Sequence, residues 1–419
     1  MAATSNDRGG ARALVVGSGG REHALAAALH ASPSVGHVAF AGGPNAGMTR
    51  FCEAIDPAAV GTAEGFDLVV IGPEAPLADG LADRLRAAGR TVFGPGAAAA
   101  RLEASKAFTK EICAEVGAPT AKAAICSSKA EALAALHRMG APVVVKADGL
   151  AAGKGVVVAE TMDAAERAVA ECFEGAFGEA GSLVVLEERL EGPEVSLFVL
   201  SDGETVRPLA SARDYKRAFD GNAGPNTGGM GAVSPAPGFR PDEEAAAMAQ
   251  IVRPSLAALT RRGAPFVGVL YAGLMLTREG PKLIEYNVRF GDPECQVIFP
   301  RLTSDAYTLL HATAAGRLAD APLTMSAQTA LGVVVAAAGY PGPVEKGEVI
   351  AGLDAVEAAG ARVYHAGTRP DGARVLSNGG RVLTVVATGE DPATARDSVY
   401  AALTHLDWPG GRMRHDIGA

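Results

Sequence analysis

Residues 143–158, VVVKADGLAAGKGVVV, constrain the fold more than any other stretch of the chain. Two valine-rich runs flank a glycine-rich loop, a pattern that predicts a strand, a flexible loop and a second strand. Lys146 ends the first run, and the loop contributes three glycines and a second lysine: Gly149, Gly153, Lys154 and Gly155. Glycines let backbone N–H groups approach an anion, and lysine ammonium groups attract phosphate oxygens. The stretch therefore predicts a lid over a phosphate.

Two alternatives compete with the lid. A Walker A loop, G-x-x-x-x-G-K-[ST], needs a hydroxyl after the lysine and a helix after the loop. Here Gly155 replaces the hydroxyl residue, the first glycine is one residue too close, and a strand is expected to follow. The Walker A interpretation therefore fails, whereas a plain glycine-rich hairpin stays open on this stretch alone.

Length and composition allow several domains. The chain has 419 residues and 48% hydrophobic content, enough for large cores and two to four domains. No apolar run approaches the roughly 18 residues of a membrane span, and residues 1–11 predict a loose extension without the apolar core of a signal peptide. Five scattered cysteines without a C-x-x-C pair favour a reducing cytoplasm and argue against structural zinc.

The net charge of −9 argues against nucleic acid as the main partner. It does not argue against small anions. The Debye length is about 8 Å, so distant carboxylates are screened and a local lysine cluster dominates its own surroundings.

The N-terminal region predicts a doubly wound parallel sheet, because apolar runs alternate with helical segments up to about residue 102. Residues 17–23, GSGGREH, form the turn between the first strand and the first helix. Dinucleotide binding is disfavoured, since Glu22 stands at the third glycine position and the second strand ends in Ala-Gly-Gly without an acidic residue for a ribose. A helix N-terminus of this kind suits a phosphate monoester instead.

Glu74 follows another predicted strand, at the edge where such sheets bind ligands. Its carboxylate suits sugar hydroxyls. The alternative is an exposed loop carboxylate without a ligand.

Residues 282–294, KLIEYNVRFGDPE, are the second strong element. Alternation places Glu285, Asn287 and Arg289 on one face of a strand. A carboxylate and an amide oxygen suit magnesium, and an arginine beside them suits a transferring phosphoryl group. The alternative is a half-buried strand with solvated polar residues, and the three functional side chains in line beside Gly-Asp-Pro make that the weaker interpretation.

Weaker candidates accompany these two elements. Ser105 is a predicted helix N-cap before Lys106, which is either a solvated helix lysine or a phosphate ligand. Glu187 and Glu188 end a predicted strand, where carboxylates usually face water but can also bind adenine and ribose beside a nucleotide. The loop at 224–231, rich in glycine, asparagine and threonine, predicts a substrate cradle, with a flexible linker as the alternative.

Five motifs occur in order along the chain: GSGGREH at 17–23, GPEAPL at 72–77, KADGLAAGKG at 146–155, PNTGGMG at 225–231 and EYNVRFGDPE at 285–294. Together they closely resemble the phosphoribosylamine–glycine ligase family, purine-pathway enzymes with the ATP-grasp fold. The resemblance runs from about residue 13 to residue 418.

The resemblance implies a multidomain α/β and α+β architecture. After a loose extension at 1–11, a Rossmann-like substrate domain spans 12–104. The central ATP-grasp domain comprises 105–120 and 189–326 and contains a lid domain at 121–188. A small α+β domain follows at 327–419, with predicted strands at 331–336, 362–364 and 381–386. We expect no catalytic cluster in it and a structural or surface position for His365.

The resemblance also implies a reaction. Glycine is joined to 5-phosphoribosylamine at the expense of ATP, through a glycyl phosphate, giving glycinamide ribonucleotide, ADP and phosphate. The expected cofactor is Mg²⁺ or Mn²⁺, with ATP as cosubstrate, in a cytoplasmic monomer or weak dimer that contacts the preceding pathway enzyme transiently. No nucleic acid or membrane partner is expected. The competing hypotheses are another ATP-grasp carboxylate–amine ligase and a nicotinamide oxidoreductase.

By position, the resemblance implies the following roles. ATP contacts fall to Lys106, Lys146, Gly149, Gly153, Lys154, Gly155, Glu187, Glu188, Leu190 and Glu194. Substrate contacts fall to Gly19, Gly20, Arg21, Glu22, Glu74, Asn226, Gly228, Gly229, Met230 and Gly291. Phosphoryl transfer falls to Arg289, Asp214 and Asp292, and the metal to Glu285 and Asn287. Tyr215 departs from the histidine expected there, so it receives no catalytic role.

Overall fold

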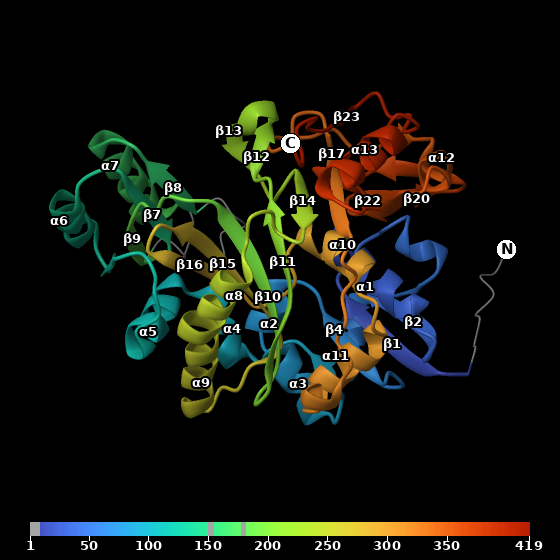
Figure 1. Ribbon diagram of the computed structural model, residues 1–419, viewed down its shortest axis with the longest axis horizontal. Coiled ribbons are helices and arrows are strands. Elements are labelled where there is room, and N and C mark those ends of the chain that lie inside the picture. The colour runs from blue at the N-terminus through green and yellow to red at the C-terminus, as the bar shows by residue number, and fades with distance from the viewer. Residues whose placement is uncertain (1–8, 150–154, 177–181) are drawn as a thin grey trace.

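The computed structural model describes residues 9–149, 155–176 and 182–419 (Figure 1). Within these ranges the strands form five sheets, of which two make up the body of the molecule. Two residues of the expected lid loop, Gly153 and Lys154, lie outside the described residues.

The N-terminal sheet is parallel, with the strand order β3-β2-β1-β4-β5. Its strands are β1 (Ala11–Val16), β2 (Val35–Ala41), β3 (Glu53–Ile55), β4 (Leu68–Ile71) and β5 (Val92–Phe93). Alternate residues of β1 enter two different cores, one containing α1 (Gly20–Ala31) and the other α3 (Leu81–Ala87) and α4 (Ala97–Ala104). The predicted doubly wound sheet is confirmed, and its strand order reverses between β1 and β4, where such sheets bind ligands.

A large antiparallel sheet forms the centre, with the order β16-β15-β10-β11-β14-β17-β22-β19. The strands are β10 (Glu194–Asp202), β11 (Val206–Asp214), β14 (Gly231–Ser234), β15 (Val267–Thr277), β16 (Gly280–Asn287), β17 (Thr329–Ala337), β19 (Arg362–His365) and β22 (Arg381–Gly389). Because β14 pairs with both β11 and β17, the sheet continues from the central region into the C-terminal region.

Helices cover both faces of the central strands. The core on one face includes side chains of α5 (Lys106–Val116), α8 (Pro241–Ala247) and α9 (Arg253–Arg261). The core on the other face includes α10 (Glu294–Ile298) and α11 (Ala306–Ala314). Opposite faces of β10 and β15 contribute to the two cores, which accounts for their nearly continuous apolar sequences.

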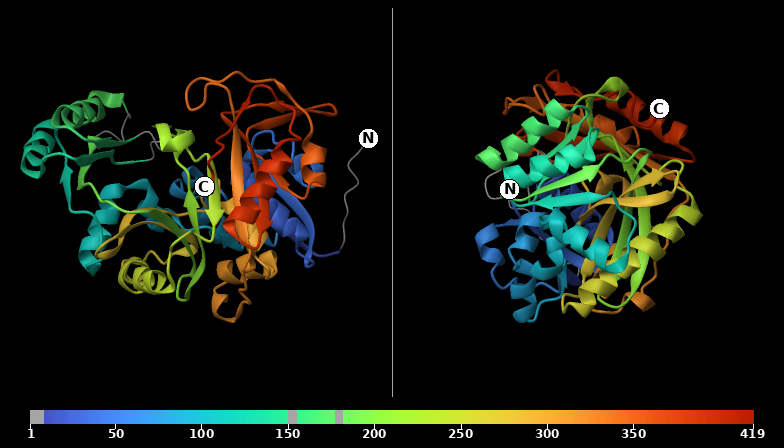
Figure 2. Two further views of the ribbon diagram at one scale, coloured as in Figure 1. Left: turned by 45° about the horizontal axis from the view of Figure 1, so that its top comes forward. Right: turned by 90° about the vertical axis from the view of Figure 1, so that its left-hand side faces the viewer.

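The lid region is a four-stranded sheet that projects from this body at the left of Figure 1, as Figure 2 also shows. Its order is β6-β9-β7-β8, with β6 at Ala123–Cys126, β7 at Val143–Ala147, β8 at Val156–Ala159 and β9 at Val184–Glu188. The predicted strands on either side of the glycine-rich loop are β7 and β8, which pair antiparallel. Helices α6 (Lys129–Met139) and α7 (Met162–Glu171) pack on the sheet around a core of its own.

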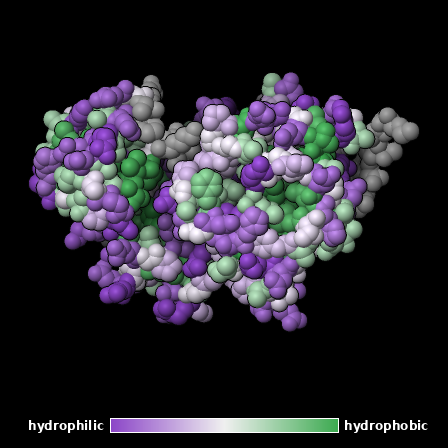
Figure 3. All heavy atoms as spheres, turned by 90° about the horizontal axis from the view of Figure 1, so that it is seen from above, coloured by the Kyte–Doolittle hydropathy of each residue, from purple (hydrophilic) through white to green (hydrophobic). Residues whose placement is uncertain are grey.

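The C-terminal region packs α13 (Pro392–Leu403) and α12 (Leu353–Ala358) against β17, β19 and β22. A smaller sheet of β18 (Val349–Ile350), β20 (Thr368–Asp371) and β21 (Arg374–Ser377) lies beside them. Seen from above in Figure 3, hydrophilic residues cover much of the surface, with hydrophobic patches on both the lid side and the C-terminal side. In the described parts of the chain, every helix falls short of the length and apolar character that crossing a bilayer demands.

Candidate functional site

A buried cluster of two lysines and one glutamate lies where the lid sheet meets α5. Lys146 Nζ is 2.9 Å from Glu187 Oε2 and donates to the Ile284 carbonyl oxygen at 3.2 Å. Lys110 Nζ lies 3.2 Å from Glu187 Oε1 and donates to Thr120 Oγ1 at 2.8 Å. All three charged side chains are 8% exposed or less. Two cations share one carboxylate, so the cluster carries excess positive charge that favours an anionic ligand.

A third lysine joins this cluster from the start of α5. Ser105 caps the helix as predicted, its Oγ accepting from the Phe108 N–H at 3.0 Å. Lys106 Nζ then donates to the carbonyl oxygen of Gly149 at 2.9 Å, so it reaches the described start of the lid loop. Burial lowers the pKa of Lys106, while Glu285 and Asp148 oppose that shift. The phosphate ligands expected from the sequence, Lys106 and Lys146, therefore lie at one place.

Glu285, on β16, faces this cationic cluster. Burial alone would raise the pKa of Glu285, but Lys216, Lys146 and Lys106 lower it overall, so the carboxylate stays ionised. Its neighbour across the sheet is Gly273, where a Cβ would come within 3.3 Å of Glu285 Cγ. A glycine at 273 thus leaves the carboxylate its space.

The oxygen donors on β16 fit a metal shared with a nucleotide. Glu285 offers a carboxylate and Asn287 an amide oxygen, which is the donor type Mg²⁺ prefers. Among the described residues no group of three His, Cys, Asp or Glu is placed to hold a metal by itself. Mg²⁺ commonly takes one or two protein oxygens and completes its shell with phosphate and water, so a two-donor site fits it.

Arg289 is held between two glutamates. Its Nε lies 3.3 Å from Glu74 Oε2 and its Nη2 2.7 Å from Glu103 Oε1. Nη2 also donates to Asn287 Oδ1 at 3.3 Å. Glu103 has a second bond, accepting from the Val288 N–H at 2.8 Å. The guanidinium thus joins the N-terminal sheet edge to β16. No sequence pattern marks Glu103, because a glutamate near the end of a helix is ordinary.

The glycine turn after β1 is occupied by the protein's own carboxylates. The Gly19 N–H donates to Glu22 Oε2 at 2.6 Å, and the Arg21 N–H donates to Asp292 Oδ2 at 3.2 Å. Glu22 also accepts from Arg21 Nε at 2.6 Å, and a Cβ at Gly20 would fall 3.5 Å from Asp292 Oδ1. Two carboxylates at a helix N-terminus repel a phosphate, so this geometry favours hydroxyl or amine donors over the phosphate expected at the turn.

Asp292 contacts residues of α1, α10 and β22. Besides the Arg21 N–H it accepts from Gln296 Nε2 at 2.8 Å and pairs with Arg381 Nη2 at 3.4 Å. Burial alone would raise the pKa of Asp292, but Arg381 and Arg21 lower it overall. Gly291 beside it has no room for a side chain, since a Cβ would lie 2.3 Å from a carboxylate oxygen of Glu294. Asp292 is therefore a fixed anion.

Arg381 also fixes the predicted substrate loop. Its Nη1 donates to the carbonyl oxygens of Gly228 and Asp292, and lies 3.4 Å from that of Gly229. The Gly228 N–H donates to Tyr340 Oη at 3.0 Å. The sequence predicted no catalytic cluster in the C-terminal region, and Arg381 is a residue of that region that contacts the predicted substrate loop. Its only sequence signal is a charged residue at the start of an apolar strand.

Asp214 ends β11 inside a small polar cavity that also includes Glu194, Lys216, Tyr271 and Glu285. Burial raises the pKa of Asp214 to about 7, with Lys216 opposing the shift and Glu294 adding to it. Lys216 Nζ pairs with Glu194 Oε2 at 2.5 Å. The cavity thus brings together three sequence candidates, namely Asp214, Glu194 and Glu285 of the metal pair.

The remaining candidates make contacts outside the groups of side chains described above. Glu188 Oε1 accepts from the Lys122 N–H at 2.9 Å, and Leu190 is half-buried just after β9. Gly155 accepts a backbone bond from the Ala147 N–H at 2.8 Å. Asn226 is exposed, whereas Met230 is buried with its N–H bonded to the Tyr215 carbonyl oxygen at 2.8 Å.

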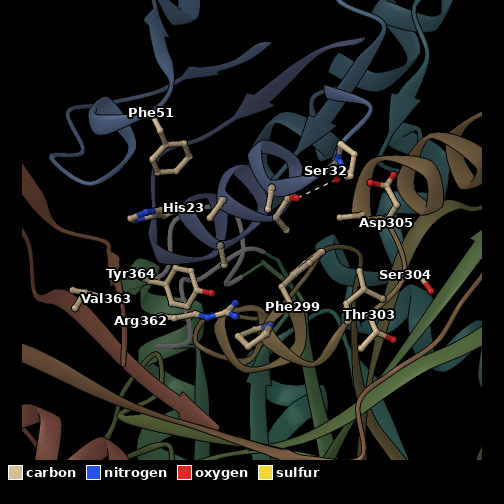
Figure 4. Close-up of a pocket in the computed structure, with 18 of the residues that line it drawn as sticks. His23, Ser32, Phe51, Phe299, Thr303, Ser304, Asp305, Arg362, Val363 and Tyr364 are labelled. Atoms are coloured by element: carbon tan, nitrogen blue, oxygen red, sulfur yellow. Dashed lines mark hydrogen bonds between the residues drawn. The ribbon is translucent and has the colours of Figure 1, made fainter. Parts of the chain in front are cut away.

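A second cavity, larger than the polar one, lies elsewhere (Figure 4). It measures about 730 Å³ and is bordered by α1, α11, β19 and the 3₁₀ turn Phe299–Arg301. Small and aromatic side chains form most of its wall, with His23, Asp305 and Tyr364 among the polar ones. It contains none of the three lysines of the lid cluster. Size would favour it over the polar cavity as a ligand site, but the charged side chains converge instead around Lys106, Lys146 and Glu285.

Family models match almost the whole chain in three consecutive parts. They are the N domain of phosphoribosylglycinamide synthetase at residues 11–103, its ATP-grasp (A) domain at 104–295 and its C domain at 330–419.

Curated relatives named phosphoribosylamine–glycine ligase align over nearly their full length. Those of Mesorhizobium japonicum and Brucella melitensis are 50% identical over 414 and 416 residues, 97% of this chain and 97% of each relative. That of Streptomyces coelicolor is 49% identical over 420 residues, 97% of this chain and 99% of the relative.

Solved structures give the same picture. The phosphoribosylamine–glycine ligase of Thermotoga maritima superposes with a TM-score of 0.86 at 31% identity, covering 97% of this chain and 100% of that one. The biotin carboxylase domain of a Hydrogenobacter thermophilus 2-oxoglutarate carboxylase, in complex with MgADP, gives a TM-score of 0.72 at 18% identity, covering 96% and 91%. The second likeness concerns the fold alone.

Proposed function

The chain belongs to the phosphoribosylglycinamide synthetase family, and we propose that it joins glycine to 5-phosphoribosylamine with cleavage of ATP to ADP and phosphate. The observation that carries the proposal is the full-length similarity to relatives named phosphoribosylamine–glycine ligase, which are 50% identical over 97% of the chain. The convergence of three lysines, an ionised glutamate and a clamped arginine beneath the lid supports it independently. Family membership leaves no basis for the oxidoreductase hypothesis.

The first step is attack of the glycine carboxylate on the γ-phosphate, which forms glycyl phosphate and releases ADP. Lys106 and Lys146 neutralise charge on the triphosphate, because both ammonium groups lie where the lid loop begins. Glu285 and Asn287 would hold the divalent metal, Mg²⁺ or Mn²⁺, which supplies charge neutralisation on the phosphates. Arg289, oriented by Glu74 and Glu103 before substrate arrives, stabilises the transferring phosphoryl group.

The second step is attack of the sugar amine on the acyl carbon, with loss of phosphate. The amine must release a proton as the amide forms. Asp214, whose pKa is raised to about 7, is suited to accept it near neutral pH. Glu22 and Glu74 offer carboxylate oxygens to the sugar at the edge of the N-terminal sheet, and the loop at 226–231 encloses glycine. Adenine lies against the strand end at Glu187, Glu188 and Leu190, with Glu194 near the ribose.

Several finer statements belong to the same proposal. The domains divide as the sequence predicts, the enzyme acts in the cytoplasm, and it is a monomer or weak dimer. A transient contact with the preceding enzyme would protect the unstable amine.

The test is an ADP-release assay with ATP, glycine and freshly made phosphoribosylamine. ADP release that requires both glycine and the sugar amine supports the proposal. Formation of AMP, or no turnover, contradicts it. A panel of other amino acids separates this reaction from that of another ATP-grasp carboxylate–amine ligase, because only the glycine enzyme should reject larger side chains.

A further inference from the structure

An exposed hairpin precedes the predicted substrate loop. Strands β12 (Arg217–Phe219) and β13 (Ala223–Asn226) pair as a two-stranded sheet across a turn at Asp220–Asn222. Every residue from 219 to 226 is exposed. A two-stranded hairpin is marginal in water without further packing. The position of this hairpin therefore depends on bonds to other parts of the chain.

Residues 414–418 provide such bonds, and Arg414 is their centre. Its guanidinium donates to the carbonyl oxygen of Arg217 at 3.0 Å and to Asn222 Oδ1 at 3.4 Å, so it spans both sides of the turn. Asp416 accepts two bonds from the same guanidinium, at 2.7 and 2.8 Å. Arg414 is only 2% exposed. A buried arginine in a bidentate pair is a rigid contact, and removing one partner leaves a buried charge uncompensated.

The turn is bonded to the same segment from its other side. The His415 N–H donates to Asp220 Oδ1 at 2.7 Å, and the Gly221 N–H donates to Asp416 Oδ2 at 2.9 Å. Hairpin and C-terminal segment lie side by side at the top of Figure 1. Almost 200 residues of sequence separate these partners, so the contact follows from the tertiary fold and not from local chain geometry.

Tyr215 connects this contact to the site. Asp214 and Lys216 line the polar cavity, whereas Tyr215 between them packs against the C-terminal core, as alternation along an extended chain requires. Its Oη accepts from the Gly418 N–H at 3.0 Å, and the Arg414 guanidinium carbon lies 5.4 Å from its ring centroid. The residue that departs from the family pattern is therefore a contact of the C-terminal segment.

We propose that residues 414–418 position the substrate loop at 226–231, with Arg414 as the positioning residue and Tyr215 as its anchor. The inference rests on the proposed function. The loop is bonded to the anchored connection between β11 and β12, since the Thr227 and Met230 N–H groups donate to the carbonyl oxygens of Lys216 and Tyr215, each at 2.8 Å. A displaced hairpin therefore displaces the loop, and small displacements of substrate-holding groups have large kinetic effects.

The test compares Arg414→Ala and Asp416→Asn with Arg412→Ala. Arg412 is a matched control, because its guanidinium donates to the carbonyl oxygens of Pro409 and Gly411 in its own segment, each at 2.8 Å. We expect the KM for glycine to rise about tenfold in the first two variants. The KM for ATP should stay within twofold of wild type, because the lysine cluster is untouched. Arg414→Lys, which keeps the charge but not the fork, should be intermediate.

A second measurement is independent of turnover. Amide hydrogen exchange across residues 216–230 should be faster in Arg414→Ala and Asp416→Asn than in Arg412→Ala. Asp416→Asn preserves side-chain volume, so it tests the contact if Arg414→Ala fails to fold. Unchanged exchange, or an unchanged KM for glycine with faster exchange, overturns the proposal. If the wild-type chain shows no ligase activity, the proposed function fails, and hydrogen exchange still decides whether the segment holds the hairpin.

Discussion

Two glycine-rich segments of this chain look alike in sequence and differ in the ligand they suit. The turn at 17–20 follows a buried strand and opens α1, and its Gly19 and Arg21 N–H groups are bonded to carboxylates of Glu22 and Asp292. The loop after β7 begins beside the ammonium groups of Lys106 and Lys146, and Lys106 donates to the carbonyl oxygen of Gly149 in that loop. One segment is prepared for hydroxyl and amine donors, the other for phosphate.

The difference teaches that glycines permit close approach but do not choose the ligand. The choice is made by charged side chains from distant parts of the chain. Asp292 is 271 residues from Arg21, and Glu187 of the lid bonds Lys110 of α5. If the turn binds hydroxyl and amine donors and the lid loop binds phosphate, substitutions in the two segments should affect different substrates.

The largest effect should come from the lid. Lys146→Met removes a buried ammonium while keeping much of its aliphatic volume, and leaves Glu187 paired with Lys110 alone. One of the three lysine ammonium groups near the start of the lid loop is lost, so kcat/KM for ATP should fall on the order of 10³-fold. Initial rates of ADP release over a range of ATP concentrations measure this. Lys129→Met is the control, because Lys129 is an exposed lid lysine paired with Glu174, and its rate should match wild type.

Arg289 joins the edge of the N-terminal sheet to β16, and its loss should rank next. Arg289→Ala removes the donor that spans Glu74 and Glu103, and turnover should fall 10²- to about 10³-fold. The same change leaves two nearby carboxylates without their counter-charge, so thermal unfolding must be measured beside the rate. A stable variant with an unchanged rate would remove Arg289 from the chemistry.

Much of the fold followed from the sequence because its signals are local. The β7–loop–β8 hairpin and the polar face of β16 could be identified from alternation and glycines within a dozen residues. Glu103 and Arg381 could not, since a helix-end glutamate and a strand-start arginine carry no local mark of their partners. Site residues that act through long-range bonds become visible only when the fold brings those partners together.

A smaller effect should come from the glycine turn, where Glu22→Gln keeps the shape and removes the charge. If the turn receives sugar hydroxyls, the KM for phosphoribosylamine should rise about tenfold, because bonds to a charged acceptor are worth 1.5–3 kcal/mol. The KM for ATP should not change. If the turn receives the phosphate, removing a negative charge should lower the KM for the sugar instead. Glu53→Gln, an exposed glutamate of the same sheet, is the control.

The smallest effect concerns stability, and it belongs to the helix that follows the turn. Burial lowers the pKa of His23 to about 3, from about 6.5 in an unfolded chain. Between these values the unfolded state binds the extra proton, so stability is full above about pH 6.5 and is lost as pH falls, by roughly 1.4 kcal/mol per unit from this group.

Denaturant unfolding at several pH values should therefore show a shallower acid-side slope for His23→Asn than for wild type. Asparagine retains an acceptor near the one that takes the His365 N–H at 2.8 Å. A uniform loss of stability from the smaller side chain does not alter this slope. His137→Asn, at an exposed lid position, should leave the slope as it is. Equal slopes in all three proteins would mean that His23 is protonated in the folded state as it is in the unfolded state. His23 would then contribute nothing to the pH dependence of the free energy of unfolding.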